Sequence, residues 1–168
     1  MNVSLREFSP RDLPMLDAWA ASGDLKRFMS RTAPRSFADG RLSDELTSCH
    51  VIVADRRDVG CVWLERCVAD ESVADLGIFL AGAVDRGRGV GRRALELAQS
   101  VAAERWRLQK VRLRVRETND RAIACYLAAG FKPVGRGEKI VAGKQICFVE
   151  MERRLKEEPA VRANALRA

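Results

Sequence analysis

The sequence predicts a single α/β domain of the α+β kind, with a mixed, mostly antiparallel central sheet and helices on both faces. The main observation is the order of the expected elements, β-α-α-β-β-β-α-β-α-β-β, in which strands follow one another and also alternate with helices. The second is size, because 168 residues of which 47% are hydrophobic suffice for one core. We expect the domain over residues 1–154 and a frayed tail over residues 155–168.

The chain opens with a strand-like segment over Val3–Phe8. Ser9 then offers a helix cap, and Pro10 suits the first helical position because its fixed φ is already helical. A helix at this point is expected to end at Ser22 and Gly23, since glycine favours helix ends.

Residues 26–34 show no clear periodicity and are expected to be irregular. A second helix is expected from residue 36 or 38 to Thr47, because Leu42 and Leu46 recur at helical spacing.

Four strand-like segments occupy the centre of the chain, the first two joined by a tight turn. They are Cys49–Ala54, Val59–Arg66, Ser72–Leu80 and Val111–Arg116. In the last segment apolar residues alternate strictly with Arg112, Arg114 and Arg116, which is typical of a half-buried strand.

The C-terminal part alternates helix and strand. One helix is expected over Gly89–Trp106, and another from residue 119 or 120 to Gly130. A final hairpin turns at Ala142 and Gly143 and returns over Lys144–Arg153.

The composition excludes some classes of protein and favours anionic ligands. The net charge is +7, mostly from arginine, which suits phosphates, nucleic acids or acidic surfaces. No apolar run is long enough to span a membrane, and the N-terminus lacks the apolar stretch of a signal peptide. Five cysteines without a C-x-x-C pair indicate reduced thiols in a cytoplasmic protein, with no metal site, and the sole histidine, His50, is interpreted as structural.

A glycine-rich loop lies between an expected strand and the start of an expected helix. It reads Arg86-Gly87-Arg88-Gly89-Val90-Gly91 and is followed by Arg92. The first amides of a helix have no partner within the helix and, with the helix dipole, favour an anion. We therefore interpret residues 86–92 as a pyrophosphate-binding turn. The loop lacks the Gly-Lys-Ser or Gly-Lys-Thr of a phosphate-binding P-loop, and Arg92 stands where a dinucleotide fingerprint needs its third glycine.

A second block follows the expected strand at residues 111–116. Asn119 opens a helix rich in small residues that carries the only tyrosine, Tyr126, and ends in Gly130-Phe131. Together with the loop from Arg86 to Gly91, this block resembles the GNAT superfamily of acyl-CoA-dependent N-acyltransferases, over roughly Val3–Arg153. It looks most like the broad group of ribosomal-serine, spermidine and aminoglycoside acetyltransferases, and Arg114 stands where ribosomal-alanine acetyltransferases carry a glutamate.

The resemblance implies acetyl-CoA as the co-substrate and a GNAT-like fold. It implies that backbone groups of the strand before the loop pair with the pantetheine arm, that amides of the loop hold the diphosphate, and that Asn119 contacts the cofactor, although Asn119 also suits a helix cap. The implied cofactor-binding residues are Ile78, Phe79, Leu80, Arg86, Gly87, Arg88, Gly89, Val90, Gly91, Arg92, Asn119 and Tyr126.

The resemblance also implies a catalytic role for Tyr126, whose phenol would protonate the departing thiolate, with a core aromatic as the alternative. Asp75 matches a position at which some relatives carry a catalytic glutamate, but it is one methylene shorter. Glu65, Glu71 and Glu117 are other candidate bases, and each carboxylate also fits a solvated surface role.

The expected function is therefore direct transfer of acetyl from acetyl-CoA to a primary amine, of a small molecule or a protein. One alternative is an acyl-CoA-binding sensor of the same fold. Another, suggested by the charge alone, is a nucleic-acid-binding protein, but the chain lacks the interleaved aromatic residues expected for binding single strands. No membrane partner is expected. Dimers are common in the family, so a homodimer is a possible assembly of this chain.

Overall fold

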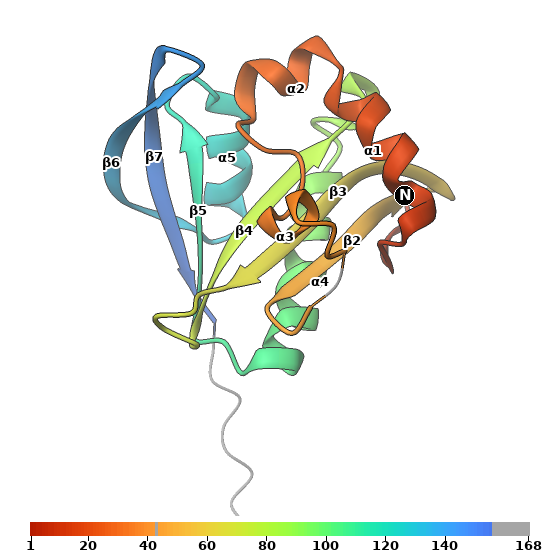
Figure 1. The fold of residues 1–168 in the computed structure, drawn as a ribbon, viewed down its shortest axis with the longest axis horizontal. Coiled ribbons are helices and arrows are strands. Elements are labelled where there is room, and N and C mark those ends of the chain that lie inside the picture. The colour runs from red at the N-terminus through yellow and green to blue at the C-terminus, as the bar shows by residue number, and fades with distance from the viewer. Residues whose placement is uncertain (43, 156–168) are drawn as a thin grey trace, which may run out of the picture.

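The computed structural model describes residues 1–42 and 44–155, so the tail expected to fray lies almost wholly outside the described residues. Seven strands form one sheet in the order β1-β2-β3-β4-β5-β7-β6 (Figure 1). The strands are β1 (Val3–Glu7), β2 (Thr47–Ala54), β3 (Arg57–Arg66), β4 (Val73–Leu80), β5 (Lys110–Arg116), β6 (Lys132–Val141) and β7 (Lys144–Arg154). The α-helices are α1 (Leu13–Ala20), α2 (Gly23–Phe28), α3 (Arg35–Ala38), α4 (Val90–Trp106) and α5 (Asp120–Ala128), with short 3₁₀ turns η1 (Pro10–Asp12) and η2 (Ala83–Asp85). The predicted mixed, mostly antiparallel sheet is confirmed, since only β4 and β5 pair in parallel.

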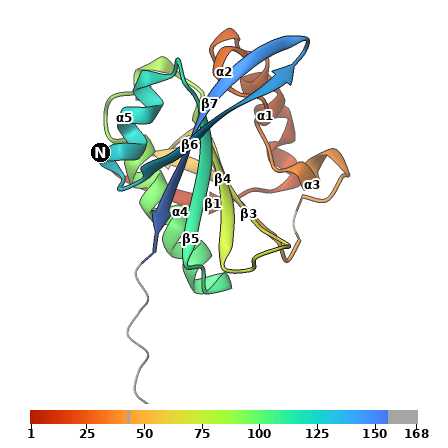
Figure 2. The same cartoon turned by 90° about the vertical axis from the view of Figure 1, so that its left-hand side faces the viewer.

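The helices cover both faces of the sheet, as predicted. Figure 2 shows α1, α2 and α3 on one side and α4 and α5 on the other. The larger core packs Leu95 and Ala98 of α4 against Val62 and Leu64 of β3. Burying these apolar faces is the main favourable term in folding.

A smaller core lies under the N-terminal helices. Leu16 of α1 and Leu25 of α2 pack with Cys61, Trp63 and Phe79 of the sheet. Alternate residues of β3 therefore serve different cores, as the two-residue period of a strand requires.

The N-terminal helices differ from the prediction. The first helix ends at Ala20, and Gly23 begins α2 instead of ending the chain's first helix, so residues 26–28, expected to be irregular, are helical. The helix expected to reach Thr47 stops at Ala38, because Gly40 has a φ of +73° and Thr47 already pairs with Glu65 in the sheet. Strand pairing thus outweighs the helical spacing of the two leucines.

Tight turns join the hairpins, with the φ values that two-residue links require. Asp55 and Arg56 have φ of 47° and 66°, and Ala142 and Gly143 have φ of 49° and 74°. Both residues of such a turn need positive φ to match the twist of the strands. The predicted hairpin at Ala142 is confirmed.

Candidate functional site

A cleft opens where β4 and β5 separate. The two strands pair only through Val73–Asp75 and Lys110–Arg112, and Figure 1 shows them diverging beyond that point. The cleft has a volume of about 880 Å³, and Ile78, Phe79 and Leu80 of β4 line it. A strand edge without a neighbouring strand presents peptide N–H and C=O groups, which can pair with an amide-containing chain as an added strand does.

The glycine loop forms one end of this cleft. Gly87 and Gly89 have φ of +74° and +81°, a conformation that favours glycine, and a methyl group at either would meet no protein atom within 4 Å. Gly89 is the N-cap of α4, so the first amides of a 17-residue helix open there.

The arginines of the loop are placed differently from one another. Arg86 and Arg92 line the cleft with Gly91, and Nη2 of Arg86 donates to the Leu80 carbonyl oxygen over 3.3 Å. Arg88 does not line the cleft, and the Val90 side chain is buried in the core, where it anchors the loop. Val90 can therefore serve a ligand only through its backbone.

The opposite wall is the start of α5. Asn119 lines the cleft, and its Oδ1 accepts a hydrogen bond from the Ala122 amide over 3.2 Å, which is the helix cap that the sequence suggested. Its side-chain nitrogen is not used by the cap, so a cofactor contact is compatible with capping.

Tyr126 lies two turns along α5 and lines the same cleft. Its ring packs edge to face on Phe131, with centroids 5.9 Å apart. Burial, and then the nearby Cys125 thiol, raise the pKa of the phenol. The hydroxyl is therefore protonated at neutral pH and can act as a proton donor.

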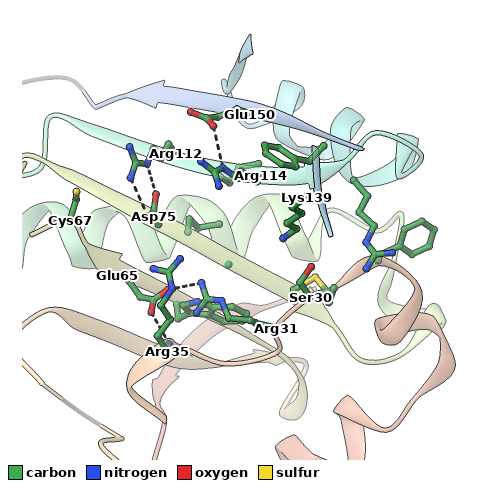
Figure 3. A pocket seen from close by; sticks show the side chains of 18 of the residues that line it. Ser30, Arg31, Arg35, Glu65, Cys67, Asp75, Arg112, Arg114, Lys139 and Glu150 are labelled. Carbon is green, nitrogen blue, oxygen red and sulfur yellow. Dashed lines mark hydrogen bonds and ion pairs between the residues drawn. The ribbon is translucent and has the colours of Figure 1, made fainter. Parts of the chain in front are cut away.

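A second pocket of about 510 Å³ adjoins the cleft (Figure 3). Phe28 and Met29, at the end of α2, line both spaces. The pocket continues the cleft along β4, since Asp75 and Gly77 line the pocket and Ile78 lines the cleft. A molecule in the pocket can therefore meet a molecule in the cleft.

The carboxylates of this pocket are already bound. Asp75 accepts hydrogen bonds at both oxygens from Arg112, through Nε and Nη2. Glu65 accepts from Nη2 of Arg31 over 2.8 Å and from the Arg35 amide over 2.7 Å (Figure 3). Both carboxylates therefore already have charge-assisted hydrogen bonds within the protein.

The two other candidate bases, Glu71 and Glu117, line neither the cleft nor the pocket. Glu150 does line the pocket, and it is held by Nε of Arg114 over 3.2 Å. Asp75 is therefore near the site but ion-paired, and it does not line the cleft that holds Tyr126.

Sequence reasoning missed this second pocket and the part that α2 plays in both spaces. The available signal was the alternation in β5: Val111, Leu113 and Val115 are buried, so the arginines between them share the other face. That face was interpreted as the polar side of a half-buried strand, but Arg112, Arg114 and Arg116 line the pocket.

Metal ligands and thiols do not form a site in the described part of the chain. No group of three or more His, Cys, Asp or Glu residues there could hold a metal ion. All five cysteines are free thiols, and burial lowers the pKa of His50 on β2, away from both spaces. No helix among the described residues is long and apolar enough to cross a membrane.

Comparison with known families gives a match that covers most of the chain. The model for the acetyltransferase (GNAT) domain matches residues 2–132. No curated protein matches the chain.

Solved structures share the fold. Spermidine N-acetyltransferase from Vibrio cholerae, in complex with CoA and spermine, has a TM-score of 0.77 at 17% identity, covering 90% of this chain and 95% of that one. Aminoglycoside acetyltransferase AAC(6')-Ib with coenzyme A has a TM-score of 0.74 at 19% identity, covering 91% and 95%. The same protein with coenzyme A and kanamycin has a TM-score of 0.74 at 20% identity, again covering 91% and 95%.

Proposed function

This chain belongs to the GNAT acetyltransferase family, and from that premise we propose that it transfers an acetyl group from acetyl-CoA directly to a primary amine. The observation that carries the proposal is the junction, at Phe28 and Met29, of two spaces: the cleft of about 880 Å³ and the pocket of about 510 Å³. Acetyl-CoA would occupy the cleft between β4 and β5. The amine would enter the adjoining pocket.

Coenzyme A has the chemistry that the cleft walls can bind. Its diphosphate would accept hydrogen bonds from the amides of Gly87–Gly91, with the positive end of α4 behind them. The amides of its pantetheine arm would pair with the free edge of β4 at Ile78–Leu80. This arrangement would bring the thioester toward the acceptor pocket and Tyr126.

The transfer follows from this arrangement. The neutral amine nitrogen attacks the thioester carbonyl carbon, so a C–N bond forms and the C–S bond breaks. Tyr126 donates its proton to the departing sulfur, and the nitrogen loses one proton through water to restore the phenol. A positioned acid of this kind contributes typically about 10²–10⁴-fold in rate.

Deprotonation of the amine does not require one of the ion-paired carboxylates. The pKa of Lys139, which lines the acceptor pocket, is lowered by burial and then by arginines that include Arg114, Arg116 and Arg31. An acceptor ammonium in the same pocket would experience the same positive potential. We infer that the pocket favours the neutral, nucleophilic amine, with water removing the proton.

A second candidate function is acyl-CoA sensing without transfer. The ion pair between Asp75 and Arg112 favours it, because that pair removes the carboxylate that the family resemblance suggested as base. The cytoplasm, where thiols stay reduced, is the compartment that fits either function.

The experiment that separates the two functions measures free thiol released from acetyl-CoA across a panel of primary amines, with calorimetry of coenzyme A alongside. Amine-dependent thiol release together with coenzyme A binding is the outcome expected of the enzyme. Binding of coenzyme A without thiol release in the presence of any amine would instead support the acyl-CoA sensor.

A further inference from the structure

The acceptor pocket carries an excess of positive charge. Seven cationic side chains line it, and three carboxylates oppose them. The cations are Arg31, Arg35, Arg66, Arg112, Arg114, Arg116 and Lys139; the carboxylates are Glu65, Asp75 and Glu150. Each of these carboxylates is paired with an arginine, and Arg66 also pairs with Glu71, which does not line the pocket, so the lining keeps an excess of positive charge.

Three buried donors that line this pocket have no hydrogen-bond acceptor among the described residues. They are Nε1 of Trp63, Nε of Arg66 and Nε of Arg116. A buried donor without an acceptor is destabilising, and such groups in a native structure call for a missing partner. An oxygen-bearing anion would satisfy these donors and neutralise charge at once.

The indole of Trp63 is packed against β4. Its ring lies so close to Gly77 that a methyl group there would come within 2.3 Å of Cε2, the atom bonded to Nε1. Trp63 and Gly77 are paired across β3 and β4, and both line the pocket. Trp63 is 2% exposed, so its N–H has little access to water.

From these observations we propose that the acceptor is a small amine that also carries an oxyanion, a carboxylate, phosphate or phosphonate, bound by Arg116, Arg66 and Trp63. The proposal rests on the function proposed above and narrows its substrate class. Polycationic amines are disfavoured, because the carboxylates that would bind them are held by arginines. The solved relatives that contain spermine and kanamycin therefore share the fold but not, on this proposal, the acceptor charge.

The test uses matched amines that differ in the anion. Thiol release is measured with O-phosphoethanolamine against ethanolamine, with alanine against alaninamide, and with spermidine as the polycation. In at least one of the two pairs, we expect kcat/KM to be at least about tenfold higher for the anionic amine than for its neutral counterpart. Such a factor corresponds to one charge-assisted interaction. This preference should appear although the anion makes the amine harder to deprotonate.

Two variants assign the preference to the pocket. Arg116→Gln should reduce the ratio of kcat/KM between the anionic and neutral members toward one. Arg136→Gln removes the same charge from an exposed position of β6 that does not line the pocket, and it should leave the ratio unchanged. Equal ratios in wild type and Arg116→Gln, no preference for the anionic member in either pair, or spermidine as the best acceptor, would overturn the proposal while leaving acetyl transfer intact.

An NMR measurement keeps the proposal testable even if no amine is acetylated. The indole N–H signal of Trp63, assigned with Trp63→Phe, should shift on adding O-phosphoethanolamine or alanine and not with ethanolamine or alaninamide. The Trp106 indole donates to the Glu45 carbonyl oxygen over 2.9 Å and is the internal control that should not move. No thiol release with a Trp63 shift would refute the enzyme but support an oxyanion site; no shift, or an equal shift with the neutral amines, would refute the site.

Discussion

Tyr126 is partly buried and lines the cleft between β4 and β5. Burial raises the pKa of its phenol, so the proton that a departing thiolate needs is held on oxygen over the whole neutral range. Its sequence spacing from Asn119, two helical turns, places both residues on the cleft side of α5, as the resemblance implied.

Tyr126→Phe should lower kcat about 10²-fold, because the variant loses the proton donor but keeps the ring that packs on Phe131. Affinity for acetyl-CoA, measured by calorimetry, should change little. Unaltered kcat on a confirmed acceptor would remove Tyr126 from the chemistry.

Gly77→Ala should destabilise the fold by about 1–3 kcal/mol, since its methyl group would lie 2.1 Å from the Trp63 ring. Gly23→Ala is the matched control, because nothing lies within 4 Å of that position in α2. Urea denaturation should separate the two variants. Equal midpoints would mean that Trp63 moves easily and that its N–H is not fixed in place.

At the residue scale, the sequence identified the cleft residues better than the acceptor residues. Glycines and an asparagine at helix starts carry local signals, so Gly87, Gly89 and Asn119 could be predicted. The ion pair of Asp75 with Arg112 joins residues 37 positions apart and depends on the parallel pairing of two strands. No local pattern reports such a partner.

At the scale of elements, α4 joins the core to the glycine loop. Val90 is fully buried while Gly89, its neighbour, opens to the cleft with a φ of +81°. The helix start is thus fixed by packing on one side and free for an anion on the other.

Gly89→Ala tests this helix start. Alanine at positive φ should cost roughly 1 kcal/mol, and the same cost is expected for Gly143→Ala, whose φ is +74° in the distant β6–β7 turn. A methyl group at either position meets no protein atom within 4 Å. Calorimetry should therefore show weaker coenzyme A binding for Gly89→Ala alone, and equal affinities in both variants would argue against a diphosphate at this loop.

The first elements of the chain are joined by Arg6 and Asp12. Arg6 of β1 donates to both oxygens of Asp12 over 2.8 and 2.9 Å. These bonds, followed by those from Ser9, lower the pKa of Asp12 to about 2. Because this is below the ordinary value of about 3.9, the ion pair adds stability above that value and loses it as the pH falls toward 2.

Asp12→Asn should therefore be less stable than wild type near neutral pH, with the gap narrowing as the pH falls from about 4 to about 2. Urea denaturation at several pH values measures the gap. A constant difference across this range would show that the charge on Asp12 does not stabilise the fold.

Element prediction failed where tertiary contacts compete with local pattern. The leucines at 42 and 46 have helical spacing, yet α3 ends at Ala38 and Trp106 of α4 donates to the Glu45 carbonyl oxygen. Segments with strong alternation, such as β5, needed no such correction.

At the scale of the whole molecule, the sheet creates both binding spaces. Pairing of β4 with β5 ends at Asp75, which opens the cleft, and β6 and β7 add Lys139, Ile146 and Phe148 to the adjoining pocket. The fold class followed from element order, but the position at which two strands separate depends on the three-dimensional pairing. The charge of the pocket likewise emerges only when strands and loops from across the chain are brought together.

The most direct test of the account is a crystal structure of the protein with coenzyme A. We predict the diphosphate on the amides of Gly87–Gly91, the pantetheine arm along Ile78–Leu80, and the sulfur within hydrogen-bonding reach of the Tyr126 hydroxyl. Coenzyme A bound on another surface, or with its sulfur pointing away from Tyr126 and the acceptor pocket, would contradict the account.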